Sequence, residues 1–462
     1  MELTARKIAS RQNTILMILI ATALIMGGGG SPAPLPEMAV QLGALALAVV
    51  WVLISPRTWS DAAPQAWLLA GLLFVLPVLQ LIPLPPALWH NLPGRELETE
   101  ALALVGAADS WRPWSLAPSR TLASLLAVIP PAIVLVMTAS LDRWGRAMAV
   151  AMVAGIALLT MVVGAGQMSG GDGNALRFYV PEPSYLAGFQ ANHNTTADVL
   201  LIGMVAFAAL VREWSDRRRL TPRADSRLGI VAGGTALLSL GVVLTASRAG
   251  TLLLPVAWLG VLAIVRPWLS FPRRTAVYLF ILVPISLIAA VLVLMVSPTF
   301  ARLLDRFDFA SEFRPQLWRD TLFAVQQYFP FGAGVGAFYP VFVAIERLEV
   351  VDPSVPNRAH NDFLEFTLES GIFGAILMAV AFVTISRLVL AAWRRPPVGS
   401  AAQACFAVAT FAIIALHSQV DYPLRSISVA CIAALAAGLL MPPANAPARA
   451  PASPERTTKE PI

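Results

Sequence analysis

Long apolar runs separated by short polar segments occupy most of the chain. A helix needs about 20 such residues to cross the hydrocarbon core of a bilayer. Because lipid offers the backbone no hydrogen-bond partner, a run that crosses is expected to be helical. The runs lie near residues 14–30, 36–55, 65–83, 121–139, 145–165, 195–212, 228–246, 249–268, 276–296, 361–384, 401–418 and 426–441. The pattern predicts an all-α polytopic membrane protein with about 12 transmembrane helices.

The composition supports this interpretation. The chain is 57% hydrophobic and 13% charged, with a mean hydropathy of +0.70, which excludes an ordinary soluble domain. We expect one integral membrane domain over residues 1–441, with a large outer loop near 297–360 that contains amphipathic helices. The Pro-rich segment 442–462 is predicted to be a disordered cytoplasmic tail. Cys405 and Cys431 lie inside apolar runs without CxxC spacing, so packing roles are expected rather than zinc or redox chemistry.

The distribution of Lys and Arg orients the predicted helices, because cytoplasmic loops of membrane proteins are enriched in these residues. With the N-terminus in the cytoplasm, 21 of the 33 Lys and Arg residues fall on inner segments, most densely between Arg212 and Arg227. An even number of spans also leaves the C-terminus in the cytoplasm. The net charge of +6 is ordinary for such a protein and gives no reason to expect a nucleic-acid partner.

The other 12 cations lie on the outer side, against the bias of such proteins, so they require another explanation. All histidines lie on this face or at its edge: His90, His193, His360 and His417. The three longest outer segments are near residues 84–120, 166–194 and 297–360. The polar chemistry of the chain is therefore expected on the outside, beyond the reach of ATP.

The densest polar cluster is RAHNDFLE, Arg358 to Glu365, at the start of a long apolar run. An imidazole titrates near neutral pH, so His360 suits the role of a general base. Asp362 or Glu365 would orient the ring or share its proton. Asn361 or Asp362 also suits the N-cap of the following helix, which is a structural role compatible with function.

The turn TASRAG, Thr245 to Gly250, holds Arg248 at the outer membrane boundary. An arginine at this depth is costly unless it is paired or reaches the interface. Arg248 is therefore either an interfacial anchor or part of an anion site that faces the bundle. The small neighbours of Arg248 allow close helix approach and leave room for a ligand.

The segment FRPQLWRDTLFAVQQYFP, residues 313–330, reads as an amphipathic helix at the outer membrane surface. Its predicted apolar face contains Leu317, Trp318, Thr321, Leu322 and Val325. Arginine side chains bind phosphate oxygens in a bidentate manner, which makes Arg314 and Arg319 candidates for a phosphate site. A solvated basic helix over lipid headgroups is the alternative.

Three further polar segments are less specific. FGAGVGAF, residues 331–338, matches neither known Gly-rich phosphate-binding pattern and is predicted to be a tight turn that ends the amphipathic helix. HSQVDYPLR, residues 417–425, places Asp421 and Arg425 where they can pair, which is a sufficient structural account. GFQANHNTTA carries Asn192 and His193 just before an apolar run.

Taken in order, TASRAG, FRPQLWRDTL, GAGVGAF, RAHNDFLEFTLESGIFG and HSQVDYPLR resemble the O-antigen ligase and O-antigen polymerase superfamily. LIPLPPALW and the pair Asn192 and Asn194 are similar to that family too, and the resemblance spans roughly residues 81–430. Each motif alone is weak, but the ordered series is fairly specific. One departure is TASRAG, where many relatives have a second glycine after the arginine.

The resemblance implies a membrane glycosyltransferase of the bacterial inner membrane that acts at the periplasmic face. Such enzymes take glycan from undecaprenyl pyrophosphate without a metal, a nucleotide sugar or another cofactor. The acceptor is lipid A-core for ligases and another lipid-linked glycan for polymerases. By motif, His360 is the candidate base, and Arg248, Arg314 and Arg319 bind pyrophosphate. The candidate supporting residues are Arg358, Asp362, Asn192, Asp421 and Arg425.

The chemistry of the residues agrees with this reading. Arginines stabilise the charge that develops on a pyrophosphate leaving group, and a base helps a poorly nucleophilic hydroxyl. No DxD-type metal motif stands out in the outer loops. A transporter or lipid flippase is the competing prediction, but we find no repeat between the two halves and the charges gather at one face. A membrane scaffold leaves the outer arginines without a role. Ligase and polymerase are not separable from these residues.

Overall fold

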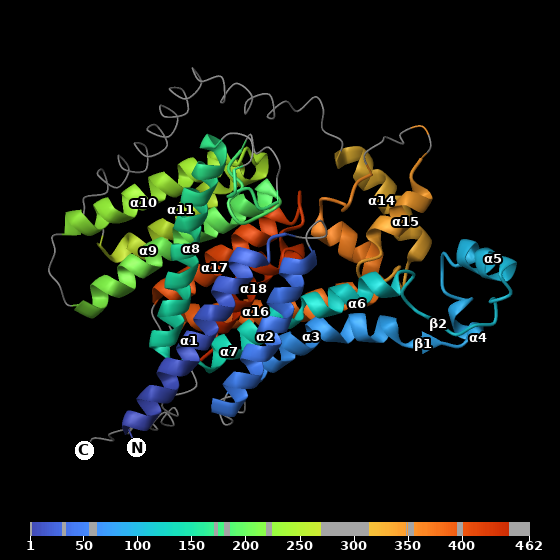
Figure 1. Cartoon of the computed structure of the whole chain (residues 1–462), viewed down its shortest axis with the longest axis horizontal. Helices are drawn as coiled ribbons and strands as arrows, with labels where there is room; N and C mark the ends of the chain where they lie inside the picture. Colours follow the sequence, from blue (N-terminus) through green and yellow to red (C-terminus); the bar gives the residue numbers. More distant parts are fainter. Residues whose placement is uncertain are drawn as a thin grey trace, which may run out of the picture.

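The computed structural model describes residues 2–29, 34–54, 62–170, 174–179, 185–218, 224–268, 314–347, 349, 355–394 and 401–442 (Figure 1). The predicted span 276–296 and the tail from residue 443 lie outside this part of the chain. The same holds for residues 297–313, the beginning of the predicted outer loop.

Helices dominate the described residues, and they follow the apolar runs. The long helices are α1 (Glu2–Met26), α2 (Pro34–Ile54), α3 (Pro64–Leu81), α6 (Pro118–Ala127), α7 (Ile129–Ser140), α8 (Arg143–Ser169), α9 (His193–Arg218), α10 (Ala224–Leu244), α11 (Arg248–Val265), α16 (Asp362–Arg394), α17 (Ala401–His417) and α18 (Ile427–Leu439). Within the described residues, 8 candidate spans are long and apolar enough to cross a membrane. Shorter apolar helices occupy residues 11–26, 401–417 and 427–439. The all-α membrane fold is confirmed, whereas the count of twelve stays a prediction.

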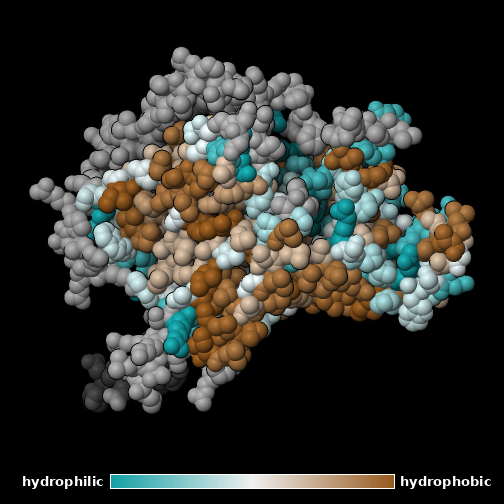
Figure 2. Space-filling model, in the orientation of Figure 1, coloured by the Kyte–Doolittle hydropathy of each residue, from teal (hydrophilic) through white to brown (hydrophobic). Residues whose placement is uncertain are grey.

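The centre of the bundle is α9, which packs against α8, α10, α11 and α17. Small residues allow these helices to approach closely, as is common in membrane bundles. A Cβ added at Gly203 would lie only 2.1 Å from the Cβ of Ala157, and one at Gly250 only 2.5 Å from the Cβ of Ala197. Two spans on the outside of the bundle, α2 and α3, present an apolar surface (Figure 2). An apolar surface is expected where helices contact the hydrocarbon core of a bilayer.

The polar outer segments fold into short elements. A lobe between α3 and α6 contains β1 (Pro83–Leu84), α4 (Pro86–Trp89), α5 (Glu96–Leu104) and β2 (Arg112–Pro113), with β1 and β2 antiparallel. The remaining elements are η1 (Arg266–Trp268), α14 (Arg314–Tyr328), α15 (Phe338–Ile345) and η3 (Pro423–Arg425). α14 and α15 lie beside the lobe, away from α9 and α10 (Figure 1). Hydrophilic side chains gather in this region (Figure 2).

The amphipathic helix is present as α14, but the predicted apolar face is only partly right. Its buried residues are Leu317, Asp320, Thr321 and Ala324. Leu322 is 51% exposed instead. Asp320 occupies part of the buried face, where it pairs with Arg347 at 2.8 Å. A helical wheel considers only the residues of one helix, so it cannot predict a pairing with a residue outside that helix.

The span α16 is interrupted at Gly371, whose φ of 55° and ψ of −144° are not helical. The Gly-rich loop, residues 331–337, docks against this break. Three backbone hydrogen bonds join them: Ala333 N to Leu368 O at 2.9 Å, Gly334 N to Glu369 O at 2.8 Å and Ile372 N to Pro330 O at 2.9 Å. Non-helical backbone within a span is tolerated where protein satisfies its polar groups. The loop thus does more than end α14, because it completes α16.

Close packing explains why this loop is rich in glycine. Gly332 has a φ of 81°, and a Cβ there would lie 2.6 Å from the backbone N of Ser370. Gln80 of α3 bonds to both the Gly-rich loop and α16. Its Nε2 donates a hydrogen bond to Glu369 O at 3.0 Å. Its Oε1 accepts from Val335 N at 2.8 Å. Hydrogen bonds therefore connect α3, the Gly-rich loop and α16 to one another.

Candidate functional site

His360 lies immediately before α16 in a strained backbone conformation. Its φ of 49° falls in the left-handed region, which a residue with a Cβ rarely adopts. Asn361 caps the helix, because its Oδ1 accepts from Leu364 N at 3.0 Å, so the predicted cap role is confirmed for Asn361. The His360 side chain is 18% exposed. The ring is therefore fixed in direction yet accessible.

The acidic partner of His360 is Asp421, not Asp362 or Glu365 as predicted. His360 Nδ1 lies 3.0 Å from Asp421 Oδ1. Burial alone would raise the pKa of Asp421, but the hydrogen bond from His360 and the charges of His360, His417 and Arg314 hold it below its ordinary value. Asp421 is thus an ionised carboxylate at neutral pH. A proton on Nδ1 that bonds to it leaves the Nε2 lone pair to accept another proton.

Tyr422 and Asn192 complete the surroundings of the ring. The His360 and Tyr422 rings meet edge to face, with centroids 5.0 Å apart. Asn192 Nδ2 donates to the Tyr422 hydroxyl at 3.2 Å. Burial, and next the nearby Asp421 charge, raise the pKa of Tyr422 to about 12, so its hydroxyl stays neutral. Asn192 therefore reaches the site through Tyr422, from the beginning of α9.

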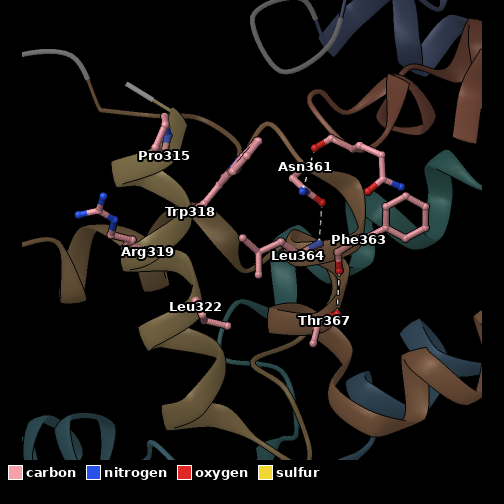
Figure 3. A pocket seen from close by; sticks show the side chains of 9 residues that line it. Pro315, Trp318, Arg319, Leu322, Asn361, Phe363, Leu364 and Thr367 are labelled. Carbon is pink, nitrogen blue, oxygen red and sulfur yellow. Dashed lines mark hydrogen bonds between the residues drawn. The ribbon is translucent and has the colours of Figure 1, made fainter. Parts of the chain in front are cut away.

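The three candidate phosphate-binding arginines occupy different positions. Arg314 begins α14, and its positive charge acts on both Asp421 and His417. Arg319 lines an open groove of about 450 Å³ between α14 and α16. In Figure 3 the Arg319 guanidinium points away from Asn361, across α14. Arg314 thus acts electrostatically on the carboxylate that pairs with His360, whereas the Arg319 guanidinium faces away from Asn361.

Arg248 is the first residue of α11. Ala246 before it has a φ of 57°, and Ser247 caps the helix by accepting from Gly250 N at 3.0 Å. The following turn of α11 packs on Ala197 near the start of α9, the helix that follows Asn192. Arg248 therefore lies at the same end of the bundle as the residues around His360.

The other candidate supporting residues belong to a buried ionic network. Arg425 pairs with Glu369 at 2.7 Å, Glu365 at 3.3 Å and Asp362 at 3.6 Å. Arg358 Nη1 bonds to Glu365 Oε1 at 2.9 Å. The expected pairing of Arg425 with Asp421 is wrong, because α16 supplies three carboxylates that lie closer to the guanidinium. Paired charges of this kind are costly to break one partner at a time. The network is a framework for the site.

The sequence contains a signal for this network. Glu365 and Glu369 are four residues apart, on one face of an apolar helix, and both are fully buried. Acidic side chains inside a span mark functional or structural sites by default. Glu369 Oε1 also accepts from Gly336 N at 2.8 Å, so it joins the Gly-rich loop to Arg425.

A second His–Asp pair lies inside the bundle. His417 Nδ1 is 2.6 Å from Asp198 Oδ1, and the two side chains are 0% and 1% exposed. Asp198 was not a predicted site residue, although an aspartate in an apolar run is the same kind of signal as Glu369. Asp421 N donates to His417 O at 2.9 Å, so the two pairs are neighbours.

The arrangement suits proton transfer next to an anion. A partly exposed imidazole is oriented by a carboxylate, and the charge of Arg314 acts on that carboxylate. Among the described residues, no group of three or more His, Cys, Asp or Glu side chains is placed to hold a metal ion. The His360–Asp421 pair offers acid–base chemistry.

Comparison with known protein families matches residues 233–379 to the family described as O-antigen ligase. The matched segment includes Arg248, Arg314, Arg319, His360 and the Gly-rich loop. Asn192 and Asp421 lie outside it. No curated protein is significantly similar to the chain.

Proposed function

Because residues 233–379 belong to the O-antigen ligase superfamily, we propose that the protein transfers a glycan from undecaprenyl pyrophosphate to an acceptor hydroxyl. The family match over these residues supports an enzyme of the O-antigen ligase or polymerase type that acts in surface polysaccharide synthesis. The proposed acceptor is lipid A-core. The reaction would take place at the periplasmic face of the bacterial inner membrane, with both chain termini in the cytoplasm.

The observation that carries the proposal is the His360–Asp421 pair, with its Nδ1–Oδ1 distance of 3.0 Å. Asp421 orients the ring, and Nε2 of His360 accepts the proton of the acceptor hydroxyl. The hydroxyl oxygen forms a bond to the anomeric carbon while the bond from that carbon to the pyrophosphate oxygen breaks. Undecaprenyl pyrophosphate leaves with the electron pair. A positioned base of this kind contributes typically about 10²–10⁴-fold to a rate.

The arginines would stabilise the charge that develops on the leaving pyrophosphate. The electrostatic effect of Arg314 on Asp421, the partner of His360, supports this role. Arg248 and Arg319 would bind the same pyrophosphate from α11 and α14. Fixed positive groups near a developing anion are usually the largest contribution to catalysis, and they would act here without a metal ion.

The supporting residues would hold this geometry rather than react. Arg358, Asp362 and Arg425 belong to the ionic network under the site, and each pairs with an oppositely charged side chain. Asn192 would fix Tyr422 against the imidazole. No proton transfer is needed at any of them.

The surface-glycan pattern of a deletion strain tests the proposal. Loss of all ligated glycan, with long chains retained on the lipid carrier, is the result expected for a ligase. Single unpolymerised repeats on the core would instead identify an O-antigen polymerase, the alternative with the same donor chemistry. A normal glycan pattern would exclude both.

The Arg248→Ala variant is the companion test in the complemented strain. It removes a cation proposed to bind pyrophosphate, so transfer should be abolished at an unchanged protein level while lipid-linked donor accumulates. An Arg387→Ala variant serves as the control, because Arg387 lies far along α16 from His360. Full glycan display by Arg248→Ala would leave Arg248 as an interfacial anchor.

A further inference from the structure

The loop that carries His360 is bonded to the helix that carries Arg314 and Arg319. Trp318 of α14 donates from its Nε1 to the carbonyl oxygen of Ala359 at 2.9 Å. Ala359 directly precedes His360 and is 0% exposed. A single indole N–H thus joins α14 to the peptide from which the imidazole extends.

The backbone around His360 is held on both sides. On one side, Ala359 N donates to Glu365 Oε2 at 2.9 Å. On the other, Asp362 N donates to Ser418 O at 3.0 Å. A non-glycine residue keeps a left-handed φ only when its surroundings fix it, and such residues gather at functional sites. Glu365 lies on α16, and Ser418 lies in the turn after α17. The hydrogen bond from Trp318 differs from these two because it comes from α14.

The placement of Trp318 on α14 gives this bond a specific meaning. Trp318 follows Arg314 by one helical turn and directly precedes Arg319. Its side chain also lines the groove between α14 and α16, beside Asn361 (Figure 3). One hydrogen bond therefore links the helix that carries the two arginines to the residue that precedes His360.

We propose that Trp318 is a positioning residue that fixes the His360 imidazole relative to the arginines of α14, through the carbonyl of Ala359. The proposal rests on the proposed role of His360 as the base. It predicts that the indole N–H contributes to the rate of transfer and not to the binding of the donor. An imidazole displaced by a fraction of an ångström loses alignment, and a misplacement of about 1 Å costs roughly 10²-fold.

The test is Trp318→Phe in the purified full-length protein, which keeps an aromatic wall and removes the donor. With a lipid-linked glycan as donor, kcat should fall about tenfold while the KM for the donor stays within about twofold. Trp393→Phe is the matched control, since Trp393 is 82% exposed near the end of α16 and should retain full activity. Replacing Trp318 by benzothienylalanine removes the same N–H with less change of shape and should give the same result.

A spectroscopic readout separates this proposal from the proposed function. The chain has 4 histidines, so the imidazole NMR signals of ring-labelled protein can be assigned with a His360→Ala variant. Trp318→Phe should shift the His360 signal and leave that of His90, in the lobe, in place. This result is expected even if His360 proves not to be the base.

Two outcomes would overturn the proposal. An increase in donor KM with an unchanged kcat would mean that Trp318 only supports α14 and its arginines. A His360 signal and a kcat that are both unchanged in the two Trp318 variants would mean that the bond to Ala359 does not position the ring.

Discussion

The two His–Asp pairs have the same chemistry but different surroundings. His417 and Asp198 are 2.6 Å apart and shielded from solvent on α17 and α9. His360 and Asp421 are 3.0 Å apart, and the His360 side chain is 18% exposed. Only the second pair can meet a substrate hydroxyl without rearrangement of the bundle. Accessibility, more than residue type, therefore distinguishes the candidate base from a structural histidine.

The backbone of the two histidines differs in the same way. His417 is the last residue of a helix and is held by helix packing. His360 occupies a left-handed position that hydrogen bonds from Trp318, Glu365 and Ser418 sustain. A strained conformation costs of order 1–3 kcal/mol and persists only where the surrounding contacts fix it. The comparison predicts that the two pairs respond differently to mutation.

The largest effect is expected from His360→Ala. Without the imidazole no group accepts the acceptor proton, so transfer should fall by at least about 100-fold. The side chain is partly exposed, so the amount of folded protein should stay as in the wild type. Surface-glycan gels with immunodetection of the protein measure both. Full glycan display by a stably expressed variant would remove His360 as the base.

Asp421→Asn is expected to have the next largest effect. The amide keeps the shape but removes the negative charge that orients the ring, so kcat should fall by about tenfold or more. The lowered pKa of Asp421 adds a stability test. A carboxyl group with a lowered folded-state pKa stabilises the protein above its ordinary pKa, and this contribution is lost as the pH falls through the lowered value.

Thermal unfolding as a function of pH measures this contribution. The wild type should lose stability on acidification through that window, and Asp421→Asn should lose less over the same range. Equal acid sensitivity of the two proteins would show that the ionised Asp421 carboxylate does not stabilise the folded protein.

His417→Ala tests the buried side of the comparison. It leaves Asp198 buried without its partner, which typically costs about 3–5 kcal/mol when the pair is charged. The yield of folded protein and its melting temperature should fall, whereas the rate per folded molecule should remain within a fewfold of the wild type. A stable His417→Ala protein with a transfer defect equal to that of His360→Ala would reverse the roles of the two pairs.

Asn192→Ala should have the smallest effect. It removes one hydrogen bond to Tyr422, worth about 1 kcal/mol, and leaves the ring contact between Tyr422 and His360. A reduction in transfer of about threefold is expected in an assay with purified protein. A loss as large as that of Asp421→Asn would indicate that Asn192 contacts substrate directly.

The sequence predicted what depends on local patterns. Apolar runs of sufficient length produced the helices, because each helix satisfies its own backbone. The cap at Asn361 and the amphipathic α14 follow from residues within a few positions of each other. His360 stands out in the sequence because a polar cluster directly beside a long apolar run is unusual.

The partners of the site residues were not predictable in the same way. Asp421 lies 61 positions from His360, whereas Asp362 and Glu365 are nearby in the sequence, so local spacing favours them as partners. Local spacing likewise favours a pair between Arg425 and Asp421, but in the structure Arg425 pairs with Glu369 of α16. The break at Gly371 carries no signal in hydropathy, since it depends on the docking of the Gly-rich loop.

Chemical rescue in a reconstituted system tests most directly which histidine acts as the base. Purified His360→Ala and His417→Ala proteins in liposomes would be given a lipid-linked glycan donor, an acceptor and increasing imidazole. Imidazole should restore transfer to the His360→Ala protein and leave the rate of the His417→Ala protein unchanged. Wild-type transfer by His360→Ala without imidazole, or rescue confined to His417→Ala, would contradict the assignment.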